Sequence, residues 1–548
     1  MVEPNDAKRE MADVEEFEGL VLADVIPRLD KWWLQYPNLR KLNLLLLSAF
    51  LAQFTCGFNG SMLNGMQSLP LWREAFGDST GANLGTLVNA INIGVLVSAL
   101  FSSQLCEIFG RKKLITLGTF LIIIGSALQG GAQNLGMFIA GRIIIGLGTG
   151  IVAVAAPQLM TEVAYPTHRG KMVSLYMTQH CPATILICYT YQGYLVAAWT
   201  TFGTFKMNSS WSWRLPSLLQ GVPAILQLIL SIWVPESPRW LVYKDRRDEA
   251  LSVLSQYHSC GDHDSRLVRF ELLEIEATLE EEKKHKAIQW SEFIRTSGNR
   301  KRLWILLFMG FAAQLSGLGL TGYYLTKILN SIGVTNANTQ LLINAIAAVW
   351  QLCCSVFFAM LIDRVGRRGL ITFGITTMLV VFILWTICSA LNEERHFSDR
   401  PLVLAVIAMI FLFQVGYQLF AISTVPYVVE CSLYSLRSKT AMIFQFCGYS
   451  ASFFTGYVNP VALDRIGWRY YIFACAVLGV ECVFAWWYLP ETKGKGLEEI
   501  GQIFDGDERL TGTQAITKKR EEKYRAFDES SLCERKAFSA NHIEKGEE

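Results

Sequence analysis

Charged residues recur at matched positions in the two halves of this 548-residue chain. The stretch Glu107–Arg111 has an acid, two other residues, a glycine and an arginine, and Asp363–Arg367 repeats this order. An arginine can hold a carboxylate through two parallel hydrogen bonds, so such residues can form specific ion pairs. The repetition indicates an internal duplication that retained its charged residues.

Two further matches support the duplication. Each half has a glutamate seven residues before an arginine, and each has a Pro-Glu motif after its last apolar segment. These are Glu162 with Arg169, Glu430 with Arg437, and the stretches Pro235–Arg239 and Pro490–Gly494. We predict that these charged residues form a gate on the cytoplasmic side. Acidic residues of one half would pair with basic residues of the other half when the two halves come together on that side. The residues of this gate are Arg111, Glu162, Arg169, Glu236, Arg239, Arg367, Arg368, Glu430 and Arg437. The alternative is that the basic residues only orient the chain in a membrane, which leaves the matched glutamates unexplained.

Long apolar segments separate these charged motifs. The chain is 51% hydrophobic and 18% charged, and a helix needs about 20 apolar residues to cross a membrane. Twelve segments meet this requirement: 42–62, 84–104, 114–133, 137–157, 171–197, 216–234, 303–329, 340–361, 370–391, 402–429, 440–461 and 470–489. Since lipid cannot satisfy backbone polar groups, each segment is predicted to be a helix. The fold class is therefore an all-α membrane protein with twelve transmembrane helices in two six-helix bundles.

The charged stretch between the sixth and seventh segments divides the chain. We predict a tail (1–41), a first bundle (42–234), a linker with surface helices (235–302), a second bundle (303–489) and a second tail (490–548). Lysine and arginine concentrate in the loops on the side of both tails, which places both termini in the cytoplasm. Asn208, on the opposite side, begins an Asn-Ser-Ser glycosylation motif. The absence of a transit peptide favours the plasma membrane.

Several classes of function are excluded by composition and motifs. A net charge of +2 provides no field for binding nucleic acids. The 13 cysteines lack metal-ligand spacing, and most lie in apolar runs. Nucleotide-binding loops, nucleophile elbows and zinc-protease motifs are missing, so neither an enzyme nor a cofactor or metal site is expected. The expected partners are a small-molecule substrate and the lipid bilayer, and the expected state is a monomer.

Over residues 42–505 the chain resembles the sugar porter family of the major facilitator superfamily. The motifs that carry this resemblance are Pro235–Arg239, Pro490–Gly494 and Gly141-Arg142. Other stretches are similar to the fungal lactose, cellodextrin and hexose permeases: Ala197–Gly203, Trp213–Ser217, Tyr457–Pro460 and Gly467–Tyr471. The resemblance implies two six-helix bundles that hold a sugar between them by polar and aromatic side chains, and transport by alternating access.

Departures from the family pattern bear on mechanism. Proton-coupled relatives carry an aspartate in the first span that exchanges its proton against the arginine of the fourth span. Here Asn59 occupies that position and cannot titrate, while Arg142 is retained. The alignment predicts a uniporter in which Arg142 bonds to neutral partners.

Candidate substrate contacts lie in several spans. The family implies Gln314, Tyr323 and Tyr324, and intramembrane position suggests Gln179, Asn344 and Tyr427. Helix packing is the competing explanation for such amides and aromatic residues. Met177, Leu318 and Gly319 stand where relatives have polar contacts to sugar hydroxyls. The missing polar groups leave other functions open, namely a sugar sensor without transport, or a transporter of a polyol, a quinate-like acid or a secondary metabolite.

Overall fold

The structure is a computed structural model that describes residues 25–27, 33–77, 80–168, 189–284, 290–361, 365–395, 399–432, 436–493, 500, 503 and 504. All regular elements in these ranges are helices, as the sequence predicts. The fold is therefore all-α in the part that the structure describes.

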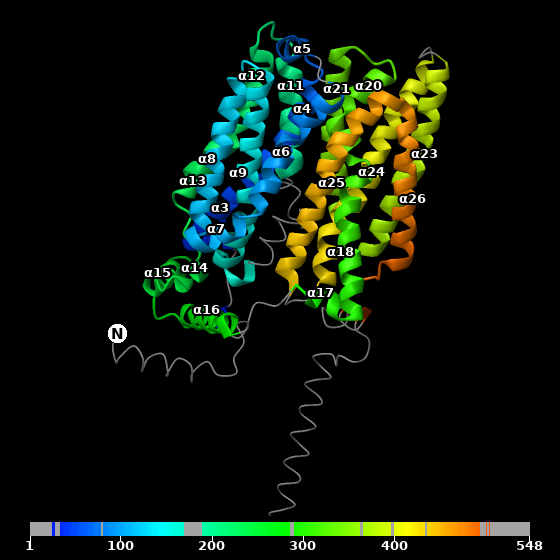
Figure 1. Cartoon of the computed structure of the whole chain (residues 1–548). Helices are drawn as coiled ribbons and strands as arrows, with labels where there is room; N and C mark the ends of the chain where they lie inside the picture. The colour runs from blue at the N-terminus through cyan, green and yellow to red at the C-terminus, as the bar shows by residue number, and fades with distance from the viewer. Residues whose placement is uncertain are drawn as a thin grey trace, which may run out of the picture.

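The first half contains the helices that begin the chain (Figure 1). Helices α3 (Pro37–Leu46) and α4 (Phe50–Met66) are joined by the short η2 (Leu47–Ala49) and form the first span. The further long helices of this half are α6 (Gly81–Ala99), α8 (Arg111–Gly130), α9 (Leu135–Val163), α11 (Tyr189–Thr204), α12 (Trp211–Leu219) and α13 (Gly221–Ser231). Two short helices, α5 (Pro70–Phe76) and α7 (Ser102–Phe109), lie in connections between spans.

The second half repeats this pattern. Its seventh span is broken into α18 (Ser297–Leu315), α19 (Leu318–Tyr323) and α20 (Leu325–Ser331). The break occurs at Gly317, whose φ of 99° is accessible to glycine at little cost. The remaining spans are α21 (Ala337–Ala359), α23 (Arg367–Glu394), α24 (Arg400–Cys431), α25 (Arg437–Ile466) and α26 (Tyr470–Tyr488).

Nine stretches of the described chain are long and apolar enough to cross a membrane, and the last of them, Lys439–Tyr488, contains both α25 and α26. The fifth predicted span begins outside the described residues and ends in α11. The sixth span is divided between α12 and α13, which contain Pro216 and Pro223. A described helix therefore occupies part or all of each of the twelve predicted positions.

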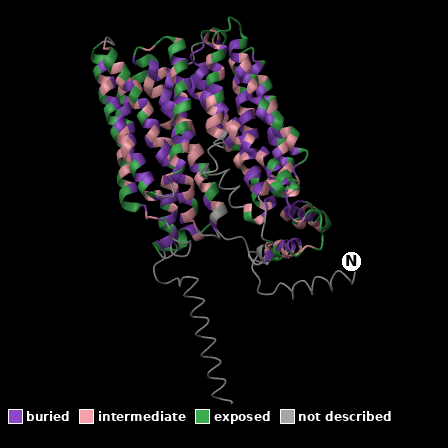
Figure 2. Ribbon diagram, turned by 180° about the vertical axis from the view of Figure 1, so that it is seen from behind, coloured by how far each residue is buried: buried purple, intermediate pink, exposed green. Residues whose placement is uncertain are grey.

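The outer faces of the helices are apolar, which suits contact with lipid. Figure 2 shows exposed and half-buried residues on the outside of the helices and buried residues between them. Trp487, Leu100 and Val480 have 80%, 72% and 70% of their surface exposed. Monomeric soluble proteins rarely expose large contiguous apolar patches, so the many exposed apolar side chains on these helices agree with a membrane-spanning chain.

Glycines allow neighbouring helices to pack closely, and equivalent contacts recur in the two halves. A Cβ on Gly118 of α8 would lie 2.8 Å from the backbone carbonyl of Gly148 on α9. In the second half, a Cβ on Gly374 of α23 would lie 2.8 Å from the backbone carbonyl of Gly416 on α24. Small residues at helix crossings are typical of packing in membranes, where van der Waals contact replaces hydrophobic association.

The linker helices mark one end of the molecule. Helices α14 (Pro238–Tyr243), α15 (Arg247–His258), α16 (Arg266–Lys284) and α17 (Glu292–Arg295) lie in the charged stretch predicted to form surface helices. We call this the linker end, and we call the opposite end, where α5 lies, the α5 end (Figure 1). The two halves stand side by side between these ends, with α6 against α25 and α11 against α21. The predicted domain boundaries remain predictions.

Candidate functional site

At the linker end of the first half, the predicted gate residues form a compact cluster. The guanidinium of Arg111 donates to Glu162 over 2.9 Å, and both side chains are largely buried. Glu236 accepts from the backbone amides of Arg111 and Lys112 at 3.0 and 3.1 Å. Because these amides begin α8, the Glu236 carboxylate caps that helix and interacts favourably with its dipole.

The second half repeats this cluster. Arg367 and Glu430 form an ion pair of 3.2 Å. Glu491 accepts from the amides of Thr492 and Lys493, and a Cβ on Gly366 would lie 3.2 Å from its carboxylate. The duplication predicted from sequence is therefore present in three dimensions.

A second pair of contacts follows the same duplication. Lys112 donates to the carbonyl of Ile232, close to the end of the sixth span, over 2.9 Å. Arg368 donates to the carbonyl of Trp486, close to the end of the twelfth span, over 2.8 Å. In each half, the second basic residue after the glycine thus ties the third span to the last one.

These ion pairs lie within the halves. Arg111 pairs with Glu162 of its own half, and Arg367 pairs with Glu430 of its own half. Arg239 is the second residue of the short helix α14, after Pro238. Arg169 and the side chain of Arg437 lie outside the described residues. Pairing across the halves remains a prediction for the state in which the halves close at this end.

At the α5 end, neutral side chains join the two halves. From the first span, Asn64 donates to Asn344 over 3.1 Å and Gln67 donates to the carbonyl of Tyr323 over 2.9 Å. Ser68 bonds to Thr326 at 3.0 Å. We call these contacts, together with those between α6 and α25, the α5-end seam. The hydrogen bonds between α6 and α25 are Asn89 to the Phe453 carbonyl, Asn92 to Ser452 and Tyr457 to Thr86.

Between the two ends, tyrosines and amides from both halves converge. Tyr191 on α11 donates to the Gln418 amide oxygen on α24 over 2.8 Å, which links the halves. The rings of Tyr191 and Tyr194 stack at 6.4 Å. Tyr323 and Tyr417 lie within electrostatic range of Tyr194. We call these five residues the tyrosine–amide cluster. All four tyrosines are half-buried.

The other predicted substrate contacts have different surroundings. Gln314 is half-buried and follows Ala313, whose carbonyl accepts from Tyr417 over 3.3 Å, so it lies next to the cluster. Asn344 belongs to the α5-end seam. Gln179 and Met177 lie outside the described residues.

Two predicted tyrosines are engaged in packing. Tyr324 is buried and donates to the carbonyl of Gly456 over 2.5 Å. Tyr427 is buried and donates to the carbonyl of Pro490 over 2.8 Å. Tyr427 follows Tyr417 by ten residues, about 15 Å along α24, so the structure does not bring it to the cluster.

The apolar position Gly319 has a structural explanation. A Cβ on Gly319 would lie 2.9 Å from the amide nitrogen of Asn459 on α25. Asn459 is buried and accepts from Tyr470 over 2.7 Å. An asparagine side chain would not fit at position 319, because an amide from another helix already reaches it. Leu318 begins α19 and is half-buried.

The predicted coupling residues are buried without complete hydrogen bonding. Asn59 is 3% exposed, and both its amide atoms lack a hydrogen-bond partner among the described residues. Arg142 is 1% exposed, and its Nε and Nη1 have no hydrogen-bond partner in the described part of the chain. The expectation that Arg142 bonds to neutral partners remains a prediction. Tyr323 and Tyr324 lie within its electrostatic range.

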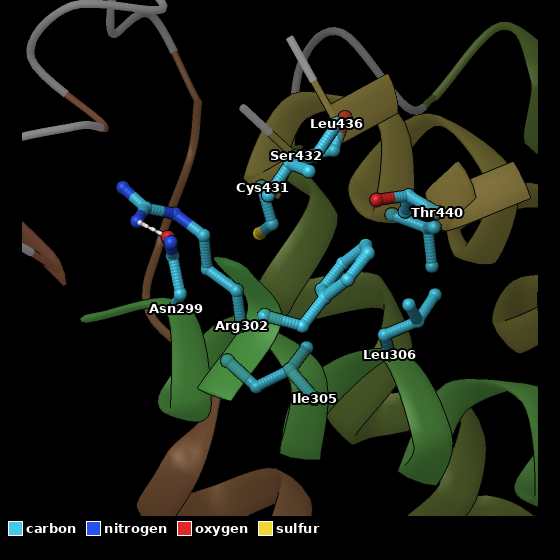
Figure 3. A pocket seen from close by; sticks show the side chains of 10 residues that line it. Asn299, Arg302, Ile305, Leu306, Cys431, Ser432, Leu436 and Thr440 are labelled. Atoms are coloured by element: carbon cyan, nitrogen blue, oxygen red, sulfur yellow. Dashed lines mark hydrogen bonds between the residues drawn. The ribbon is translucent and has the colours of Figure 1, made fainter. Parts of the chain in front are cut away.

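The cavities differ in what they can hold. A cavity of about 20 Å³ at the linker end, between α18 and the end of α24, is lined by Arg302, Asn299 and Cys431 among others (Figure 3). Arg302 donates to Asn299 there over 2.9 Å. This volume holds about one water molecule and excludes a sugar. A hollow of about 370 Å³ at the α5 end adjoins the seam at Ser68.

Within the described ranges, no group of three metal-ligating side chains is placed to hold an ion. Asn208 is exposed in the connection between α11 and α12 at the α5 end, where its glycosylation remains a prediction.

The sequence did not lead us to predict Tyr191, Tyr194 and Tyr417. A spacing of three residues between Tyr191 and Tyr194, which places both on one helix face, was the available signal.

Comparisons with known proteins agree with this architecture. Residues 45–504 match the family model described as "Sugar (and other) transporter". The MFS-type transporter oryC of Aspergillus oryzae is 27% identical over 86% of this chain and 88% of its own. The low-affinity glucose transporter HXT3 of Saccharomyces cerevisiae is 29% identical over 77% of this chain and 73% of its own.

Two further comparisons concern a sensor and a solved structure. The high glucose sensor RGT2 of Saccharomyces cerevisiae is 26% identical over 89% of this chain and 64% of its own. The partially occluded inward-open structure of the xylose transporter XylE from E. coli superimposes with a TM-score of 0.65 at 19% identity, covering 83% of this chain and 100% of XylE. The fold is thus the predicted major facilitator fold. The protein is a multi-pass membrane transporter and belongs to the sugar (and other) transporter family.

Proposed function

We propose that the protein is a uniporter for a sugar or sugar-like molecule, which binds at the tyrosine–amide cluster. The observation that carries this proposal is the bond between Tyr191 of the first half and Gln418 of the second half. Hydroxyls and amides can exchange hydrogen bonds with substrate hydroxyls, and tyrosine rings can pack on the apolar face of a sugar ring. Because both halves contribute residues to this site, its geometry changes when the halves move relative to each other.

The proposed transport cycle follows from the two ends. In the state described, the seam holds the halves together at the α5 end, so substrate would exchange through the linker end. In the opposite state, the seam opens and the gate residues pair across the halves at the linker end. We place the linker end in the cytoplasm and the protein in the plasma membrane. Repeated switching between these states carries substrate across, as alternating access requires.

Uniport is supported by the residues in the first and fourth spans. Asn59 cannot release a proton, whereas an acid beside a buried arginine could change its charge during the cycle. No aspartate or glutamate occurs among residues 171–188, the part of the fifth span outside the described structure. The first, fourth and fifth spans therefore supply no acid that could exchange a proton with Arg142 at the level of the membrane.

A thermal-shift screen of the purified protein tests the substrate assignment. A ligand that binds the folded state raises its apparent stability, so sugars, polyols and cyclic acids are compared at equal concentration. Tyr191→Phe removes the hydroxyl that reaches Gln418, and we expect about tenfold weaker binding of the best ligand. Tyr427→Phe makes the same change outside the cluster and serves as the control. Equal binding by wild type and Tyr191→Phe would exclude the cluster as the site.

The second candidate function, transport of a sugar-like acid, is favoured by Arg142. Nε and Nη1 of Arg142 have no hydrogen-bond partner among the described residues. An incompletely paired charge is costly in a membrane interior, and a carboxylate on the substrate would neutralise it. The same screen separates the candidates, because a quinate-like acid should then stabilise the protein more than its uncharged polyol analogue. Arg142→Gln should abolish this preference for the acid. A preference that survives in Arg142→Gln would exclude Arg142 as the counter-ion.

A further inference from the structure

An acidic side chain of the second half contacts the start of a helix in the first half. Asp464, near the end of α25, accepts from the backbone amide of Gly81 through Oδ2 at 2.6 Å. Its other oxygen, Oδ1, accepts from the Nζ of Lys327 on α20 at 2.5 Å. Gly81 and Asp464 are 383 residues apart in sequence. Three elements therefore meet at one carboxylate at the α5 end.

The backbone geometry explains why this contact stabilises the start of α6. Gly81 is the first residue of α6, and its amide is one of the groups that no intrahelical carbonyl can satisfy. The preceding residue, Thr80, provides no side-chain cap. Asp464 supplies the missing acceptor from the other half, and its charge suits the positive end of the helix dipole.

The contact between Asp464 and Gly81 lies in the α5-end seam, where the halves must separate during transport. It lies at the outer end of the row of contacts between α6 and α25, beyond Tyr457 with Thr86 and Asn89 with Phe453. The side chains of Lys327 and Asp464 are 16% and 36% exposed. Water can therefore replace the Gly81 amide when the seam opens, while Lys327 remains as a counter-ion within the second half.

We propose that Asp464 is a gate residue at the α5 end that favours the closed seam by capping α6 from the opposite half. Lys327 orients its carboxylate. The cap is present only when the halves meet at this end, so it stabilises one conformation of the transport cycle over the other. The proposal concerns the conformational equilibrium and holds for any substrate.

Hydrogen–deuterium exchange of the full-length protein in lipid nanodiscs tests this proposal without added cysteines. Asp464→Ala removes the acceptor, so backbone exchange within residues 80–92 and 452–466 should accelerate on the order of tenfold, as expected for losing a charge-assisted hydrogen bond. Asp464→Asn keeps an acceptor for the Gly81 amide, so it should show a smaller increase. Asp399→Ala, which removes an ion pair with Arg395 within the second half, is the matched control and should leave both segments unchanged.

Three results would overturn the proposal. Unchanged exchange of both segments in Asp464→Ala would show that the cap does not hold the seam. An equal increase in Asp399→Ala would show a general effect of charge at this end. Faster exchange throughout both bundles in Asp464→Ala would show that Asp464 stabilises the fold as a whole.

Discussion

The two ends of the helical bundle satisfy their polar groups in different ways. At the α5 end, mostly neutral amides and hydroxyls bond across the halves, as in Asn64 with Asn344. At the linker end, charged pairs such as Arg111 with Glu162 are completed within one half. Pairing inside a half allows the halves to separate there without leaving a charge unpaired, which would be costly. Among the described residues, the halves are thus bonded to each other at the α5 end, whereas the ion pairs of the linker end leave each half free to move as a unit.

The seam offers the largest expected effect. A Cβ on Gly456 of α25 would collide with the side-chain amide of Asn89 on α6. Gly456→Val should therefore prevent close approach of the halves at the α5 end and reduce uptake more than tenfold, since close-packed interfaces tolerate such overlap poorly. Uptake is measured in cells lacking their own permeases, with surface expression determined in parallel.

Gly479→Val is the matched control for this substitution. Gly479 is a helical glycine of the same half, with no atoms within 4 Å of its would-be Cβ. Its substitution should leave uptake near the wild-type value. Normal uptake by Gly456→Val would show that the seam does not need to close during transport.

The linker-end ion pairs should have the next largest effect. Glu162→Ala and Arg367→Ala each leave a largely buried partner without its counter-ion. We expect uptake to fall about tenfold in each variant, because each substitution removes one charge-assisted hydrogen bond from at least one conformation of the transport cycle. Membrane insertion should be unchanged. Glu249→Ala, which removes an exposed pair with Arg246, should have no effect. Wild-type uptake in both Ala variants would exclude a gating role.

A buried pair between the linker helices α15 and α16 also contacts the first half. His258 contacts Glu271 at 2.6 Å through Nδ1 and the carbonyl of Val163 at 3.2 Å through Nε2. His258→Ala should destabilise the docking of α15 and α16 locally by about 3 kcal/mol, as expected when one partner of a buried pair is removed. Hydrogen exchange within residues 247–280 measures this loss. Glu276→Gln, which weakens the more exposed pair with Arg247, should change hydrogen exchange in this segment little. Equal acceleration of exchange by both substitutions would show that the buried pair contributes no more than the exposed one.

The smallest effect concerns a native thiol beside the gate cluster. Burial raises the pKa of Cys106 to about 12. The thiol is therefore neutral at pH 8 and should react slowly with maleimide, with a rate that rises about tenfold per pH unit. Mass spectrometry compares it with exposed Cys260. Equally fast labelling of both at pH 8 would show that the first half is loosely packed at the linker end.

The fold was predictable from sequence because its signals are local. Apolar segments of about 20 residues predict membrane helices regardless of how they pack. The duplicated charge motifs led us to predict pairing across the halves, whereas the ion pairs of Arg111 and Arg367 in the structure lie within one half. The break at Gly317 lies inside the predicted seventh span and was not predicted.

The candidate site was harder to predict because it is assembled from distant segments. Tyr191 and Gln418 are 227 residues apart and meet only through the packing of the two halves. Tyr427 has the same residue type and span as Tyr417, but its place along α24 directs its hydroxyl to Pro490. Which side chains of a helix face the other half depends on the rotation and tilt of that helix, and the composition of the helix does not determine these.

Flux measurements in proteoliposomes test the central claim most directly. The ligand that most stabilises the purified protein is supplied outside the vesicles, with and without an imposed proton gradient. A uniporter should equilibrate the ligand at the same rate in both conditions and never accumulate it. Accumulation that requires the gradient and disappears with a protonophore would contradict the account.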